Sequence, residues 1–150
     1  MARVRDRMIQ LLSLAEQLRL VGFALVVMGL VHIVLPRLLD WPADLSGTTL
    51  LTRQVSYAHL FFIGAACVVL GALPLFCAPE LLGGTPLSTV LLAGQTAFWG
   101  LRWAAQFVYF SPLLWRGKPL FTLGHIALAV LWTWVTGVFA VALARSAGWG

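Results

Sequence analysis

The sequence predicts an all-α membrane protein, a four-transmembrane-helix bundle preceded by an amphipathic helix at the membrane interface. Of the 150 residues, 61% are hydrophobic and only 10% are charged, and the mean hydropathy is +0.93. In soluble proteins about a quarter of the residues are charged. A bilayer core about 30 Å thick needs about 20 apolar residues per spanning helix, so the chain has room for four spans with short loops. We expect no separate soluble domain.

Residues 1–18 predict a basic amphipathic helix that lies on the membrane surface. Val4, Met8 and Leu11 recur at helical spacing, and Arg3 and Arg7 lie among them. No small-residue cleavage signal follows the next apolar run. We therefore expect that run to be a retained first span and not a secretory signal.

The transmembrane domain is predicted over residues 19–144. The four spans are expected at about residues 19–36, 55–76, 87–110 and 120–144. Pro36 is expected to end the first span, and Pro74 to kink or end the second, because proline cannot donate a helical hydrogen bond. The third span is expected to end at Ser111 and Pro112.

Helix-starting residues precede three of the spans. The segment 46–49 offers N-caps for the second span. Thr85 can cap the third span, with Pro86 as its first residue, and Pro119 can open the fourth.

The basic residues indicate the orientation of the chain in the membrane. The N-terminal segment concentrates Arg3, Arg5, Arg7 and Arg19, whereas the basic residues of the first and third loops are Arg37, Arg53, Arg116 and Lys118. A concentrated N-terminal cluster usually faces the cytoplasm. We expect both termini on the cytoplasmic side.

The net charge of +5 fits contact with the lipid bilayer better than contact with nucleic acid. The basic residues are spread along the chain, and no Lys/Arg-rich face could follow a phosphate backbone. Cys67 and Cys77 lie ten residues apart, which predicts neither a redox pair nor a zinc knuckle.

A layer of polar residues is predicted inside one face of the membrane, expected to be the outer one. A rise of about 1.5 Å per residue places His32, His59, Gln106 and His125 about 6 to 9 Å inside that face. Arg102 lies about 12 Å inside the same face. Every span therefore contributes a polar side chain to one layer.

Helical spacing also places these residues on shared faces. The third span carries a stripe of Gln95, Trp99, Arg102, Gln106 and Tyr109, and the fourth carries Thr122, His125, Ala129, Trp132 and Thr136. On the first span Gly22, Gly29 and His32 share a face, and the small residues allow close helix approach. We expect these faces to point into the bundle. For Gln95, Thr122 and Trp132 the favoured role is packing and interhelical hydrogen bonding.

Arg102 is the strongest single signal, because an arginine within a span costs about 2.5 to 3.5 kcal/mol on insertion scales. The acidic residues are Asp6, Glu16, Asp40, Asp44 and Glu80, and none falls in a predicted span. A first-loop carboxylate, a lipid or a bound anion could supply the counter-charge. Alternatively, Arg102 reaches toward the interface and binds only Gln and Tyr side chains.

These residues predict a pocket that binds a small redox-active or metal-containing group. Its lining is His32, His59, Arg102, Gln106 and His125. Three variants stay open: haem b held by two histidines with Arg102 facing a propionate, a quinone, or a metal held by His32, His59 and His125. A non-catalytic accessory or assembly subunit of a larger membrane complex is the alternative. Such a subunit would bind other membrane proteins or a second copy of the chain.

Three stretches, LLTRQVSYAH, AFWGLRWAAQFVYF and LGHIALAVLW, together resemble an uncharacterised family of small four-span proteins of the bacterial inner membrane. The resemblance implies a location and no activity. The sequence supplies no nucleophile with a base, no carboxylate pair and no phosphate loop, so it indicates no reaction.

Overall fold

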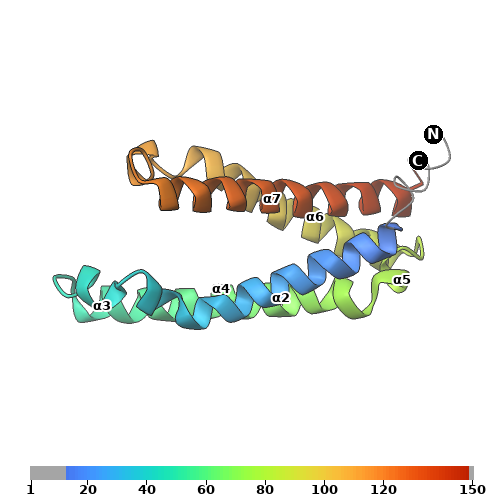
Figure 1. The fold of residues 1–150 in the computed structure, drawn as a ribbon. Coiled ribbons are helices and arrows are strands. Elements are labelled where there is room, and N and C mark those ends of the chain that lie inside the picture. Colours follow the sequence, from blue (N-terminus) through green and yellow to red (C-terminus); the bar gives the residue numbers. More distant parts are fainter. Residues whose placement is uncertain (1–12, 149–150) are drawn as a thin grey trace. The chain divides into compact units, whose positions relative to one another are not determined.

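The structure is a computed structural model that describes residues 13–148. Its elements are, in order, α2 (Leu14–Leu38), α3 (Trp41–Asp44), α4 (Leu50–Phe76), α5 (Ala78–Leu81), α6 (Pro86–Val108), the 3-10 helix η1 (Pro112–Leu114) and α7 (Pro119–Ser146) (Figure 1). No strand occurs within residues 13–148. The prediction of an all-helical chain is confirmed.

Three of the described helices, α2, α4 and α7, are long and apolar enough to cross a membrane. Helix α6 has 23 residues and is long enough, but it is not among these three because its polar stripe lowers its apolarity. The chain divides into two compact units. One is Leu18–Ala78, and the other contains the residues up to Gln17 and those from Pro79 onward. Each unit is described by itself.

Helix α2 begins earlier and ends later than the predicted first span. A capping box starts it, in which Ser13 N–H donates to Glu16 Oε2 at 2.6 Å and Glu16 N–H donates to Ser13 Oγ at 3.3 Å. The end predicted at Pro36 was wrong, because α2 continues to Leu38. Of the predicted interfacial helix, residues 1–12 lie outside the described residues, and Leu14 onward belongs to α2.

Helix α4 starts at the predicted capping segment, where Thr49 Oγ1 accepts a hydrogen bond from Thr52 N–H at 3.2 Å. The helix therefore begins at Leu50, five residues before the predicted span. Pro74 lies inside α4, which continues to Phe76. A proline in the last turn removes only one backbone donor, which explains why α2 and α4 both continue past theirs.

Glycines bring α2 and α4 into backbone contact, and Figure 1 shows these helices side by side. A Cβ added at Gly22 would lie 2.6 Å from the carbonyl oxygen of Gly71, and one at Gly29 would lie 2.6 Å from that of Gly64. Only glycine leaves room for such approach. The close helix approach expected on the Gly22 face is confirmed.

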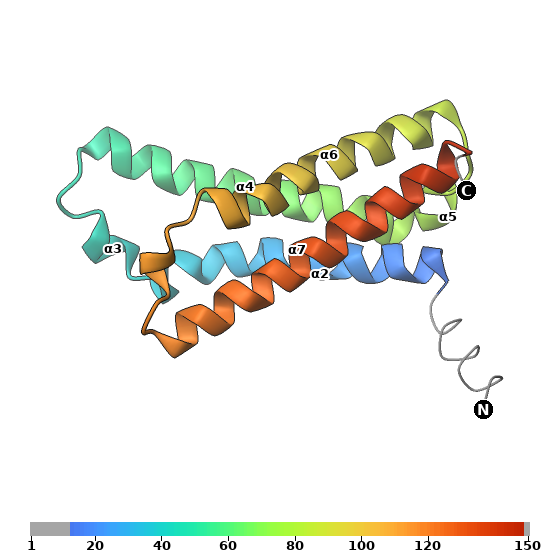
Figure 2. The same ribbon diagram turned by 90° about the horizontal axis from the view of Figure 1, so that it is seen from above.

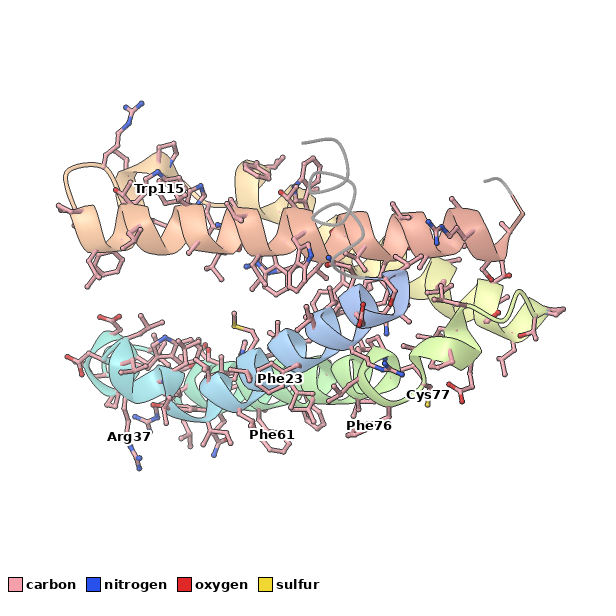
Figure 3. All side chains as sticks on the ribbon, turned by 45° about the vertical axis from the view of Figure 1, so that its right-hand side comes forward. Phe23, Arg37, Phe61, Phe76, Cys77 and Trp115 are labelled. Carbon is pink, nitrogen blue, oxygen red and sulfur yellow. The ribbon has the colours of Figure 1, made fainter. Side chains whose placement is uncertain are left out.

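The outer surfaces of this pair are apolar. Phe23 is 59% exposed, Phe61 68% and Phe76 76%. Figure 3 shows these three side chains projecting outward from α2 and α4. Exposed aromatic residues on a helix of spanning length suit contact with lipid.

Helices α6 and α7 form the second pair. As predicted, Thr85 caps α6 by accepting from Ser88 N–H at 3.1 Å, Pro86 is its first residue, and Pro119 opens α7. Figure 2 shows the two helices converging toward the start of α6 and the end of α7. There the Ser146 hydroxyl lies 2.9 Å from the Thr89 hydroxyl, within hydrogen-bonding distance.

Candidate functional site

The polar stripe of α6 faces the interior of the helix pair. Gln95 and Gln106 are each 3% exposed, and Trp99 is 1% exposed. Trp99 Nε1–H donates to Gln95 Oε1 at 2.7 Å, which satisfies a buried donor one turn along the same helix. Tyr109 was expected in this stripe, but it is the C-cap of α6 and is 82% exposed.

Arg102, Gln106 and His125 form a hydrogen-bonded chain from α6 to α7. Arg102 Nη1–H donates to Gln106 Oε1 at 3.1 Å. Gln106 Nε2 lies 2.8 Å from His125 Nδ1. We call these three residues, together with Gln95, Trp99 and Trp132, the polar seam. It holds three of the five predicted pocket residues.

The seam fixes the tautomer of His125. A guanidinium only donates hydrogen bonds, so the Gln106 atom that faces Arg102 is the amide oxygen. The other end of the amide is then the NH₂ group, which also only donates. His125 Nδ1 must accept this bond, and the neutral ring therefore carries its hydrogen on Nε2.

Aromatic rings surround the cation of Arg102. Its guanidinium carbon lies 4.8 Å from the centre of the Trp132 ring and 5.8 Å from that of Phe110. Trp132 in turn stacks on Trp99, with ring centres 5.4 Å apart and planes inclined by 8°. Cation–π contacts stabilise a guanidinium by about 0.5–1 kcal/mol at exposed sites and by about 2 kcal/mol when it is desolvated, and Arg102 is half-buried. Packing and hydrogen bonding thus explain how α6 carries this charge beside α7.

The segment between α6 and α7 folds back over His125. The Trp115 ring stacks on the imidazole at 3.9 Å between centres, with the planes inclined by 15°. Thr122 Oγ1 donates to the Trp115 carbonyl at 2.8 Å, and Gly117 allows the turn with a φ of 74°. Figure 3 labels Trp115 in this segment. Trp115 therefore covers one face of the His125 ring.

His32 and His59 belong to the other compact unit. His32 is half-buried on α2, and its Nδ1–H donates to the Met28 carbonyl at 2.7 Å. In the neutral ring Nε2 of His32 then carries a lone pair, which is the polarity of metal-binding histidines. His59 is exposed on α4, and no hydrogen bond or ring contact joins it to His32 among the described residues.

The prediction that His32, His59 and His125 share one site stays a prediction. His125 belongs to a different unit from the other two. Within residues 13–148, no group of three or more His, Cys, Asp or Glu side chains is arranged to hold a metal ion.

The sequence analysis assigned Trp132 to packing and interhelical hydrogen bonding, and it did not single out Trp115 as a site residue. In the structure Trp132 contacts Arg102 and Trp115 contacts His125, although the stripe spacing had already indicated the face of Trp132. Trp132 is 3% exposed, and its Nε1–H has no hydrogen-bond acceptor among the described residues. No feature of the sequence predicted that Trp115 would stack on His125, because this contact depends on the conformation of a loop.

The described chain is all-helical, and three of its helices are long and apolar enough to span a membrane. Its candidate site is the polar seam between α6 and α7. Comparison with models of protein families, with curated proteins and with solved structures finds no match for the chain.

Proposed function

We propose that the chain is a four-span protein of the bacterial inner membrane whose polar seam binds a lipid-soluble ligand that carries hydrogen-bond acceptors. Helix α6 is the fourth span in this proposal. Ser88, Gln95 and Gln106 are buried and Arg102 is half-buried. Trp103 Nε1–H also donates to Thr133 Oγ1 of α7 at 2.9 Å. A polar helix can enter a bilayer when a neighbouring helix covers its stripe.

The observation that carries the proposal is the contact between Gln106 Nε2 and His125 Nδ1, which leaves an N–H donor at Nε2 of the neutral ring. Haem and metal ligation through Nε2 requires the opposite polarity, with Nδ1 donating its hydrogen to an oxygen. Gln106 instead donates to Nδ1, which turns Nε2 into a donor. Of the three variants considered, a quinone suits this donor best, because its carbonyl oxygens accept hydrogen bonds and its ring is soluble in the bilayer.

The test is the content of the protein purified from membranes. We expect a colourless, metal-free protein that carries extractable quinone. His125→Phe keeps a ring for Trp115 to stack on but has no N–H, so it should purify with less quinone than wild type. His59→Phe is the matched control at an exposed position and should retain it. A Soret band that disappears in the His125 variant would overturn the proposal.

The second candidate is an accessory or assembly subunit. It is favoured by the satisfied pairs of the seam, since Gln95 binds Trp99 and Gln106 binds both Arg102 and His125. Such pairs would serve equally well to hold helices together. For this candidate, the His32→Ala, His59→Ala and His125→Ala variants should each leave the native complex unchanged on a non-denaturing gel.

A further inference from the structure

Trp132 holds a buried hydrogen-bond donor that no residue from 13 to 148 satisfies. The residue is 3% exposed, and no acceptor reaches its Nε1–H within the part of the chain that the structure describes. Buried polar groups are nearly always hydrogen-bonded. An indole N–H can only donate, so what is missing is an acceptor. In a bilayer core water is not available to supply one.

Trp132 and His125 share one face of α7. They lie seven residues apart, which is about two helical turns or 10.5 Å along the axis. Both also contact the same network, since the Arg102 guanidinium lies over the Trp132 ring and binds Gln106, which binds His125. This face of α7 therefore offers two neutral N–H donors, at Trp132 Nε1 and His125 Nε2.

We infer that Trp132 Nε1–H is a second contact for the ligand of the polar seam, and that the ligand carries acceptors at both ends of a ring, as a para-quinone does. The inference rests on the proposed function. The two donors belong to residues about two helical turns apart, so a ligand that binds both must carry its acceptors on well-separated atoms. Carbonyls on opposite ring carbons meet this condition. The two oxygens of a carboxylate share one carbon and would reach a single donor.

Trp132→Phe tests the second contact, because it removes the N–H and keeps a ring for Arg102 and Trp99. The matched control is Thr136→Val. Its Oγ1 is also buried without a hydrogen-bond partner in the described structure, but it lies one turn beyond Trp132, away from His125. The probe is decylubiquinone, titrated into each protein in lipid nanodiscs. The apparent Kd comes from the dependence of the Tm on quinone concentration.

We expect wild type and Thr136→Val to bind with equal affinity. Trp132→Phe and His125→Phe should each bind about three- to tenfold more weakly, the effect of losing one neutral hydrogen bond. If His125→Phe binds more weakly while Trp132→Phe matches wild type, the second contact is wrong and the proposed function stands. If decylubiquinone does not shift the Tm of wild type, both are wrong.

A measurement on the unaltered protein keeps the inference testable if Trp132→Phe fails to fold. In protein labelled with ¹⁵N-tryptophan, the assigned indole N–H resonance of Trp132 should shift downfield on addition of decylubiquinone. Decane, which has no acceptor, should leave it in place. An equal response to both compounds, or to neither, would overturn the inference.

Discussion

Gln106 donates a hydrogen bond from Nε2 to Nδ1 of His125 at 2.8 Å, and this single contact decides what His125 can do. Arg102 holds the oxygen end of the Gln106 amide, so the amide cannot turn without losing a charge-assisted hydrogen bond. The other ring nitrogen of His125 is left as a donor. An arginine within a predicted span thus sets the chemistry of a histidine on the neighbouring helix.

Replacing Arg102 with methionine should destabilise the protein by about 1–3 kcal/mol, because the change removes a hydrogen bond from a charged donor and a cation–π contact. Thermal unfolding in detergent measures the effect, with and without decylubiquinone. Arg116→Met, at an exposed loop position, should change stability by less than about 0.5 kcal/mol. An Arg102 variant that is as stable as wild type but loses ligand would instead favour pairing with a bound anionic group.

Alanine at Gly29 should weaken the α2–α4 pair. Its Cβ would lie 2.6 Å from the carbonyl oxygen of Gly64, so the backbones must separate, at a cost of about 1–3 kcal/mol. At Gly94 of α6 the added Cβ meets nothing within 4 Å, and Gly94→Ala should gain about 1 kcal/mol from helix propensity. Unfolding of both variants compares the two sites directly. A neutral Gly29→Ala would show that the helices do not pack through this glycine.

The predicted orientation places the segment around Gly83 in the cytoplasm and the segment around Gly47 outside. Single-cysteine variants at these two positions, with Cys67 and Cys77 replaced by alanine, can be labelled in intact cells with a reagent that does not cross the membrane. We expect labelling at position 47 and none at position 83. The reverse pattern would show that the N-terminal arginines lie outside.

Much of the fold follows from local sequence signals. Thr85 caps α6 and Pro119 opens α7 as predicted, because capping and proline effects act within one turn. Thr49 lies in the predicted capping segment, although the second span was expected to start only at about residue 55. The ends at Pro36 and Pro74 were less predictable. A proline near the end of a helix removes only one backbone hydrogen-bond donor. Each of these helices therefore continues for two residues past its proline.

The site was predicted in part. Helical spacing placed Arg102 one turn from Gln106, and the structure joins them. The direction of each hydrogen bond could not be predicted, because it depends on which end of the Gln106 amide meets Arg102 and which end meets His125 on the neighbouring helix. The stacking of Trp115 on His125 depends on a loop that has no periodic pattern.

The tautomer of His125 tests the central claim most directly. Nitrogen chemical shifts in protein labelled with ¹⁵N-histidine distinguish a ring nitrogen that carries hydrogen from one that does not. At neutral pH we predict hydrogen on Nε2 and a bare Nδ1 at His125, with hydrogen on Nδ1 at His32 as the internal contrast. Gln106→Leu should abolish the preference at His125 and leave His32 unchanged. Hydrogen on Nδ1 of His125 in the wild-type protein would contradict the account, because His125 would then have the polarity of a metal ligand.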